Sequence, residues 1–134
     1  MGVILDTSIL VDVERGLLSP AEVHEATQGE PVFLTPVTIG EMRHGLMYAK
    51  TEAQRKRREA ALAETKAVPC IPIDRETGDM FGEIAARLDK KGRPSKHRAH
   101  DLWIASVALQ HGHSVLTRNR RDFEDIPGLT VLSI

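Results

Sequence analysis

Near its N-terminus the chain reads Gly2-Val-Ile-Leu-Asp-Thr-Ser8, an apolar run followed by an acid and two hydroxyl side chains. A short unbroken apolar run that polar residues bring to an end is typical of a strand buried on both faces. Such strands occur in parallel sheets, where helices cover both faces. The stretch therefore predicts an α/β fold whose first strand ends at Asp6.

Similar apolar runs recur along the 134 residues and alternate with helical patterns. We expect further strands over 31–34, 68–73, 113–116 and 129–132, the second of these irregular or at an edge because it contains two prolines. Helices are expected over 9–13, 20–28, 38–48, 51–66, 75–91 and 102–109, with Ser19 and Asp74 as caps of the second and fifth. This alternation predicts a mostly parallel sheet with helices on both faces, and no linker divides the chain.

Composition and charge limit the classes of function that fit the chain. Lys and Arg number 18 against 19 Asp and Glu, so the net charge is −1, and aromatic residues make up only 4%. A single-stranded nucleic-acid platform built on stacked aromatic rings is therefore disfavoured. Cys70 is the only cysteine and is expected in the core. With no signal-peptide pattern and no apolar run near the roughly 18 residues of a membrane span, we expect a cytoplasmic protein.

Four acids stand where expected strands end or helices begin, namely Asp6, Glu41, Asp101 and Asp122. Because ligands bind outside the carboxyl ends of the strands in an open α/β sheet, we expect these side chains to converge. Two carboxylates about 4 Å apart repel by roughly 4 kcal/mol at an effective dielectric of about 20. A divalent cation removes this cost, and Mg²⁺ or Mn²⁺ prefers carboxylate oxygen. The pattern therefore predicts a metal-dependent site that acts on phosphate.

Each of these acids also has an ordinary structural explanation. Asp6 could cap the helix that follows it, and Glu41 could complete a capping box with Thr38. Asp101 would suit the first turn of a helix, but that helix is apolar, and a buried carboxylate needs a partner. Asp122 could form a turn. Other acids are expected to be solvated or to cap helices: Asp12, Glu14, Asp74, Asp79, Asp89, Glu124 and Asp125.

Motifs of several other catalytic sites are absent from the sequence. There is no Gly-x-x-x-x-Gly-Lys loop and no Gly-x-Gly-x-x-Gly turn, which argues against P-loop hydrolysis and dinucleotide redox chemistry. The six histidines form no zinc pattern, and no serine lies in a Gly-x-Ser-x-Gly elbow. Six Lys or Arg residues lie between positions 87 and 98, and this basic segment could steer an RNA backbone or simply be a solvated surface.

With these residues in view, the chain resembles the PIN-domain ribonucleases, and more narrowly the VapC toxins of toxin–antitoxin pairs. The matching segments run in the family order: Ile4-Leu-Asp-Thr-Ser-Ile-Leu10, Thr38-Ile-Gly-Glu-Met-Arg-His-Gly45, His100-Asp-Leu-Trp-Ile-Ala-Ser106, Leu116-Thr-Arg-Asn-Arg-Arg-Asp-Phe123 and Ile126-Pro-Gly-Leu129. Each segment is a weak indicator alone, but together they are specific. The resemblance implies one PIN domain over residues 1–134, with a three-layer α/β/α fold around a central, mostly parallel sheet.

The resemblance also implies roles for individual residues. Asp6, Glu41 and Asp101 match the core acids of the family, and Asp6 and Asp101 would bind Mg²⁺ or Mn²⁺. Asp122 would be the fourth catalytic acid, although many relatives have an acid at the position of Asn119, so either residue could complete the metal shell. Further residues would support the acids or contact the substrate: Thr7, Ser8, Thr117, Asn119, Arg43 and Arg118. Water would hydrolyse an RNA phosphodiester, leaving a 5′-phosphate and a 3′-hydroxyl.

Partners follow from the same resemblance. It implies an RNA substrate, a homodimer and a VapB-like antitoxin whose inserted segment, commonly bearing an Arg, blocks the acidic pocket. Two alternatives stay open. A phosphatase or phosphotransferase of the haloacid-dehalogenase type also has an Asp after its first strand, but it needs Asp-x-Asp, and Ser8 occupies the second position. A PIN fold that only binds a partner would be favoured by loss of an acid, and all four acids are present.

Overall fold

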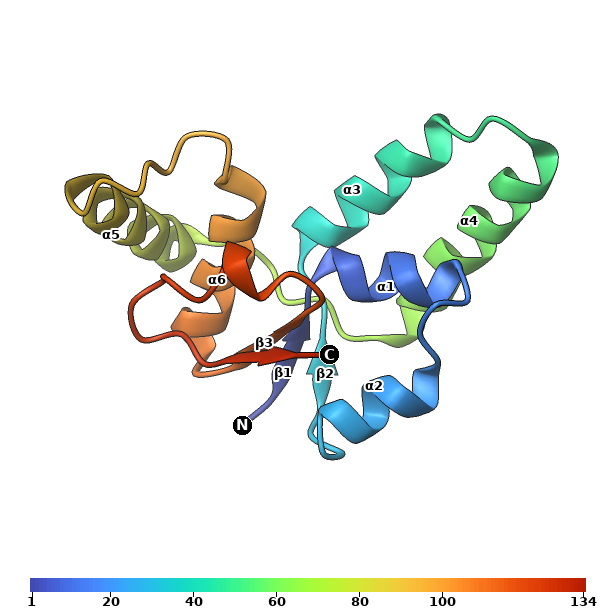
Figure 1. Ribbon diagram of the computed structural model, residues 1–134, viewed down its shortest axis with the longest axis horizontal. Coiled ribbons are helices and arrows are strands. Elements are labelled where there is room, and N and C mark those ends of the chain that lie inside the picture. The colour runs from blue at the N-terminus through green and yellow to red at the C-terminus, as the bar shows by residue number, and fades with distance from the viewer.

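The computed structural model describes residues 1–134 and has four strands and six α-helices (Figure 1). The strands are β1 (Val3–Leu5), β2 (Val32–Phe33), β3 (Ser114–Thr117) and β4 (Val131–Ser133). The helices are α1 (Thr7–Glu14), α2 (Pro20–Ala26), α3 (Pro36–Met47), α4 (Glu52–Glu64), α5 (Arg75–Lys90) and α6 (Ala99–His111). Two 3-10 turns, η1 (Thr65–Ala67) and η2 (Arg120–Asp122), complete the elements. None of the helices combines the length and the apolar character that a membrane crossing requires.

The sheet has the strand order β2-β1-β3-β4, and all of its pairings are parallel. The central strand β1 pairs with β2 on one edge and with β3 on the other, so that Val3 lies opposite both Val32 and Ser114. Where connections leave a parallel sheet in opposite directions, a crevice opens at the carboxyl ends of the strands, and ligands bind there. In this protein the crevice lies at the ends of β1 and β3.

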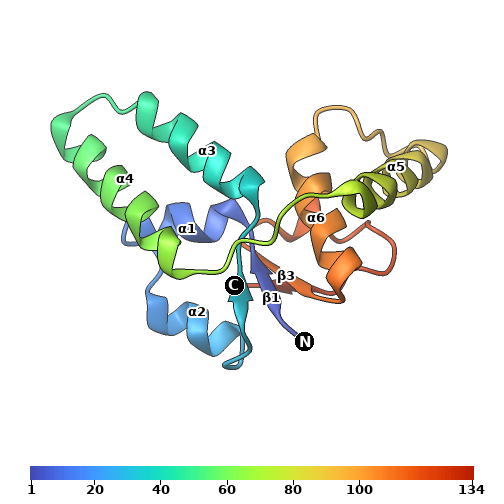
Figure 2. The same cartoon turned by 180° about the vertical axis from the view of Figure 1, so that it is seen from behind.

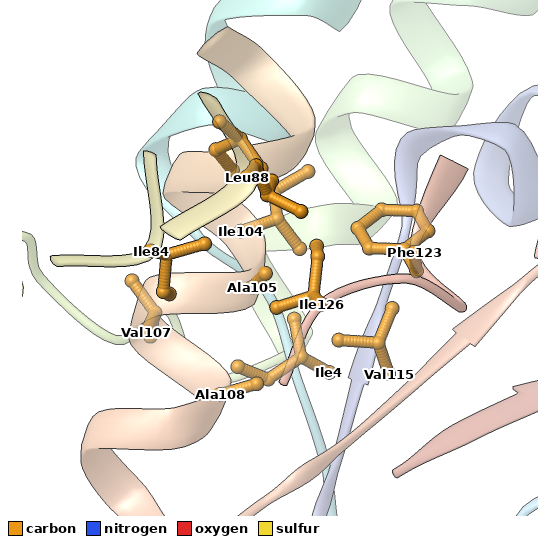
Figure 3. Packing of buried hydrophobic residues seen from close by; sticks show 11 residues of the cluster. Ile4, Ile84, Leu88, Ile104, Ala105, Val107, Ala108, Val115, Phe123 and Ile126 are labelled. Atoms are coloured by element: carbon orange, nitrogen blue, oxygen red, sulfur yellow. The ribbon is translucent and has the colours of Figure 1, made fainter. Parts of the chain in front are cut away.

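Two apolar cores cover the two faces of the sheet, because successive residues of a strand point to opposite faces. Ile4 of β1 and Val115 of β3 enter the core that α5 and α6 cover (Figure 3). Val3 and Leu5 enter the other core, which α1 and α2 help to form. The helices accordingly lie on both sides of the strands (Figures 1 and 2). The expected three-layer α/β/α fold with a central parallel sheet is confirmed.

The helices α3 and α4 form a hairpin that extends away from the sheet (Figures 1 and 2). Both helices pack against α1 near their base. Within the hairpin, Nη1 of Arg58 donates a hydrogen bond of 2.6 Å to the carbonyl oxygen of Gly45. The packing against α1 holds the first half of α3, which includes Glu41, close to the carboxyl end of β1.

The segment 68–73, expected as an irregular or edge strand, is irregular as predicted and forms no continuous strand. This segment makes one isolated parallel bridge, between Leu34 and Cys70. The N–H of Leu34 donates to the carbonyl of Pro69 (2.9 Å), and the N–H of Ile71 donates to the carbonyl of Leu34 (2.8 Å). Proline has no N–H, so Pro69 and Pro72 cannot donate to a longer ladder. Cys70 is exposed, so the core position expected for it is wrong.

The start of α3 differs from the expected one. Thr35 is the N-cap residue, so Thr38 is already inside the helix and fully buried, and the capping box between Thr38 and Glu41 is not formed. The caps expected at Ser19 and Asp74 are confirmed, and each is part of a complete capping box. The side chain of Glu41 therefore does not cap α3, and its carboxylate can take part in the site at the crevice.

The helix α6 is buried along most of its length, as its apolar sequence predicts. It begins three residues before the expected range and ends at Gly112, whose φ of +69° terminates it in the left-handed conformation that glycine favours. Its buried residues are Leu102, Ile104, Ala105, Ser106, Val107 and Ala108. Because the helix begins at Ala99, Asp101 stands in its first turn.

The ring of Phe123 is fully buried in the core that α5 and α6 cover, so its removal tests the packing of that core (Figure 3). Phe123→Ala should lower the free energy of unfolding by about 3–5 kcal/mol, because apolar contacts are lost and a cavity remains. Urea denaturation followed by circular dichroism measures the change. Met47→Ala is the control, since Met47 is 75% exposed, and it should change the value by less than about 0.5 kcal/mol. A loss below about 1 kcal/mol for Phe123→Ala would contradict the described packing.

Candidate active site

The four acids singled out in the sequence come from four separate elements around the crevice. Asp6 directly follows β1 and caps α1 by position, and Thr117 is the last residue of β3. Glu41 comes from α3, Asp101 from the first turn of α6 and Asp122 from η2. Asp6, Glu41 and Asp122 all lie close enough to Asp101 for their charges to act on it.

The carboxylate of Asp6 is buried and held by two hydroxyl groups. Ser8 donates from Oγ (2.7 Å) and Thr117 from Oγ1 (2.8 Å), both to the same oxygen, Oδ2. Each hydroxyl also accepts a backbone N–H, from Arg118 in the case of Ser8 and from Asn119 in the case of Thr117. A hydroxyl has one proton to donate, so both protons are used here. Oδ1 of Asp6 receives no hydrogen bond from the protein and is available to a ligand.

A second set of hydroxyls holds Glu41. Oγ1 of Thr7 donates to Oε1 of Glu41 (2.7 Å) and lies 2.9 Å from Oγ1 of Thr38. Because the single proton of Thr7 is directed at Glu41, Thr38 is the donor in the second bond. Nδ1 of His100 lies 3.3 Å from Oε2 of Glu41, although the His100 side chain is 69% exposed. The base of α3 is thus tied to the start of α1 through these hydroxyls.

The strongest electrostatic effect in the site falls on Asp101. Burial and then the negative charges of Asp6, Asp122 and Glu41 raise the pKa of Asp101 to about 7, against a weaker opposing effect of the Arg98 guanidinium. No Lys or Arg forms an ion pair with any of the four carboxylates, and His100 is the one basic side chain that contacts one of them, Glu41. The crevice therefore concentrates negative charge that no cationic side chain pairs with.

This donor set suits a hard divalent cation. Carboxylate oxygens are the ligands that Mg²⁺ and Mn²⁺ prefer, and Mg²⁺ commonly uses one or two carboxylates and keeps several waters. No three His, Cys, Asp or Glu side chains stand close enough together to hold an ion by themselves. The fit therefore rests on the unpaired negative charge and on the free Oδ1 of Asp6, and water would supply the rest of the coordination shell.

Asn119 and Asp122 occupy different positions in the loop after β3. Asn119 is exposed and directly precedes η2, whereas Asp122 is half-buried within it. Neither side chain donates or accepts a hydrogen bond within the protein. The charge of Asp122 acts on Asp101, and its backbone N–H donates to the carbonyl of Asn119 (3.0 Å). Of the two candidates for the fourth acid, Asn119 and Asp122, only Asp122 adds negative charge to the site.

The two arginines singled out for substrate contact have different surroundings. Arg43 is exposed and forms no ion pair. Arg118 donates from Nε to Oδ2 of Asp12 (2.8 Å) and from Nη1 to the carbonyl of Ile134 (3.0 Å). Asp12 is therefore paired rather than simply solvated, and RNA contact by Arg118 would have to compete with these two bonds.

Sequence reasoning missed the surroundings of two acids near the site. Asp125 was expected to be solvated or to cap a helix, yet Arg98 donates two hydrogen bonds to its carboxylate and a third to the backbone carbonyl of Asp122. Glu14 was expected to be solvated or to cap a helix, yet its side chain is only 8% exposed, and its nearest cations are two arginines 3.6 and 4.0 Å away. No local pattern connects partners so far apart in the sequence, so spacing alone could not have found them.

Comparison with known proteins gives a consistent result. The family model described as PIN domain matches residues 3–129. The chain is 31% identical to the ribonuclease VapC5 of Mycobacterium tuberculosis over 131 residues, which cover 98% of this chain and 92% of the relative. It is also 31% identical to the ribonuclease VapC1 of Rickettsia felis, with coverage of 100% and 97%.

Solved structures agree with these relatives. A crystal structure of VapBC-5 from Mycobacterium tuberculosis, a member of the VapBC family of toxin–antitoxin systems, aligns with a TM-score of 0.76 at 29% identity, covering 100% of this chain and 98% of that one. VapBC2 from Rickettsia felis, bound to a DNA fragment from its promoter, aligns with a TM-score of 0.85 at 20% identity, with coverage of 100% and 99%. The latter likeness concerns the fold alone.

Asp101→Asn should stabilise the metal-free protein at pH 8. The pKa of Asp101 is raised from 3.8 to about 7 in the native state, so ionisation costs the wild-type protein stability as the pH rises through this window. The variant has no such cost, and after allowance for solvent screening the gain should be about 1 kcal/mol. Thermal unfolding in EDTA at pH 4 and pH 8 measures it, with the exposed Asp79→Asn as control. Equal pH dependence in wild type and Asp101→Asn would contradict the described field.

Thr117→Val should lower the free energy of unfolding by about 1–3 kcal/mol, because Asp6 loses a donor and the N–H of Asn119 loses its acceptor. Thr35→Val is a matched control: Thr35 is equally buried, but its hydroxyl oxygen has no hydrogen-bond partner. This control should be neutral or stabilising. Urea denaturation in EDTA compares the two variants, and an equal effect of both would rule out a special role for the Thr117 hydroxyl.

Proposed function

The chain belongs to the PIN domain family, and within it to the VapC ribonucleases, and we propose that it is a metal-dependent endoribonuclease toxin controlled by a VapB-like antitoxin. One observation carries the proposal. Carboxylates from four elements far apart in the sequence lie near enough for three of them to raise the pKa of the fourth, Asp101, and no Lys or Arg forms an ion pair with them. The relatives that are named ribonucleases support RNA as the substrate.

Asp6 and Asp101 would hold the metal ion, which is Mg²⁺ or Mn²⁺, and Asp122 would complete the acid set. When bound, the ion would lower the pKa of a water molecule and neutralise charge that develops on the phosphate. Asp6 offers Oδ1, because Ser8 and Thr117 engage only Oδ2. Asp101 would give up its bound proton on metal binding, and the raised pKa makes that step dependent on pH.

Glu41 would receive the proton of the attacking water. The Thr7 hydroxyl fixes one oxygen of its carboxylate, and Oε2 remains free apart from the long contact to His100. A carboxylate held in one orientation can accept a proton without first reorganising. Attack of the activated water on the phosphodiester would leave a 5′-phosphate and a 3′-hydroxyl.

Cationic side chains around the crevice would bind the RNA backbone. Arg43 and Arg121 are exposed and form no ion pair, whereas Arg118 is engaged with Asp12 and Arg120 with Glu124. Contacts to phosphate confer affinity and salt dependence but carry no sequence choice. Selection of a particular RNA would therefore depend on other contacts or on RNA shape.

The antitoxin would follow two adjoining hollows that lead away from Glu41. A small one of about 160 Å³ borders Glu41, Glu14 and Arg58, and a larger, mostly apolar one of about 580 Å³ lies among α1, α2 and α4. They share Leu10, Glu14, Met42 and Ala61 in their walls. A segment with an apolar part and an Arg that reaches the acids would fit this path, since Arg pairs with carboxylates through two parallel bonds.

The remaining expectations stay predictions. A homodimer and a cytoplasmic location follow only from the resemblance and the sequence pattern. Neither alternative function gains support: the phosphotransferase still lacks its second Asp, and Ser8 is engaged with Asp6 as a donor. A purely binding module remains disfavoured, because all four acids are present around the crevice.

The purified chain should cleave structured RNA in Mg²⁺ or Mn²⁺ and not in EDTA. Asp6→Asn and Asp101→Asn should each lower the rate by at least about 100-fold, because each removes a charged ligand. Gel analysis of a mixed pool of structured RNA, with end-group mapping, gives the rate and the products. Asp79→Asn is the control, since Asp79 is exposed on α5, away from the crevice, and it should cleave like the wild type.

Two results would contradict this function. Cleavage that survives in both folded site variants would place the activity elsewhere or in a contaminant. Absence of cleavage, together with absence of Mn²⁺ binding in the wild type, would favour a module that only binds a partner.

A further inference from the structure

The guanidinium of Arg98 joins two parts of the site. Nη1 donates to Oδ2 of Asp125 (2.9 Å) and Nη2 to Oδ1 (2.7 Å), so the pair is bidentate. Both side chains are largely buried, at 21% and 12% exposure. A bidentate pair between largely buried partners has a defined geometry, unlike most surface ion pairs.

A third bond extends the pair to the loop that carries an acid. Nη2 of Arg98 also donates to the backbone carbonyl of Asp122 (3.0 Å). The backbone carbonyl of Arg98 itself accepts the N–H of Leu102 (3.0 Å), as the N-cap position of α6 requires. One residue therefore starts the helix that carries Asp101 and holds the turn that carries Asp122.

This connection opposes a specific force. The carboxylates of Asp101 and Asp122 repel each other. The charge of Asp122 helps to raise the pKa of Asp101, whereas the Arg98 guanidinium lowers that pKa. The turn η2 is short and has no buried residue of its own. The buried ring of Phe123 anchors the chain directly after the turn, and the bond from Arg98 to the Asp122 carbonyl links the turn itself to the start of α6.

We propose that Arg98 and Asp125 are positioning residues for the acid site, which hold the turn of Asp122 in a fixed position relative to the start of α6 and thereby favour binding of a divalent cation. The proposal rests on the proposed metal-dependent function. Neither residue touches the ion or the substrate. They act through the backbone of Asp122 and through the start of α6.

A purely stabilising role of Arg98 would be the simpler explanation. The variant Arg98→Lys distinguishes a stabilising role from a positioning role. Lysine keeps the positive charge and can pair with Asp125, but it has no planar fork that reaches two acceptors in fixed directions. Arg93→Gln is the matched control, because Nε of Arg93 also binds Asp125 (3.0 Å), but Arg93 is 56% exposed and does not contact Asp122. Asp125→Asn is a second variant, which keeps the shape of the partner and removes its charge.

The experiment measures the dissociation constant of Mn²⁺ from the full chain, with free Mn²⁺ counted by its electron paramagnetic resonance signal. Arg98→Lys and Asp125→Asn should each weaken binding about tenfold, the usual effect of losing a residue that orients metal ligands. Arg93→Gln should stay within about twofold of the wild type. Thermal unfolding in EDTA shows that each variant is folded at the temperature of the binding measurement.

The outcomes separate the two proposals. Wild-type binding that Asp101→Asn abolishes, together with unchanged affinity in folded Arg98→Lys and Asp125→Asn, would overturn the positioning role and leave the proposed function intact. Equal weakening by Arg93→Gln and Arg98→Lys would also overturn it, because Arg93 does not contact Asp122 and the bond from Arg98 to that carbonyl would then have no special effect. Wild-type protein without an Asp101-dependent Mn²⁺ site would overturn both proposals.

Discussion

Two hydroxyl protons on one oxygen of Asp6 hold the central strands together at the place where the site forms. Ser8 belongs to the helix after β1, and Thr117 ends β3, so Oδ2 of Asp6 connects the two strand ends. The same hydroxyls accept the first N–H groups of the loop that leads to η2. The buried carboxylate of Asp6 is thus a fixed centre around which the other acids lie, because both hydroxyl protons next to it are used in hydrogen bonds to it.

Packing in the rest of the molecule offsets the repulsion between the carboxylates around Asp6. The buried face of α6 anchors the residues that follow Asp101, and the buried ring of Phe123 anchors the chain directly after Asp122. Apolar burial thus holds like charges near one another, at a cost in stability that a divalent ion would relieve. Natural proteins commonly accept such local destabilisation where function requires it.

Sequence patterns predicted the layers of the fold and the acids, but not the contacts between distant segments. The buried strand before Asp6 and the apolar helix after Asp101 follow from periodicity, and both are present. The segment around Cys70 forms only one bridge, because its two prolines lack the N–H groups of a longer ladder, which is why an irregular or edge form was predicted. The spacing of Thr38 and Glu41 also allowed a capping box as an alternative role for Glu41, but the N-cap residue is Thr35, three residues before Thr38. The pair of Arg98 and Asp125 depends on tertiary geometry, which no local pattern encodes.

The strand order has a consequence for how the protein comes into being in the cell. β1 takes its central partner from residues 114–117, about one hundred positions later in the chain. Until β3 has been made, Asp6 lacks the Thr117 hydroxyl, and Asp122 does not yet exist. A nascent chain on the ribosome therefore carries no complete site until residues 117 and 122 have both been made. The topology of the sheet therefore determines when, during synthesis, the acid site first becomes complete.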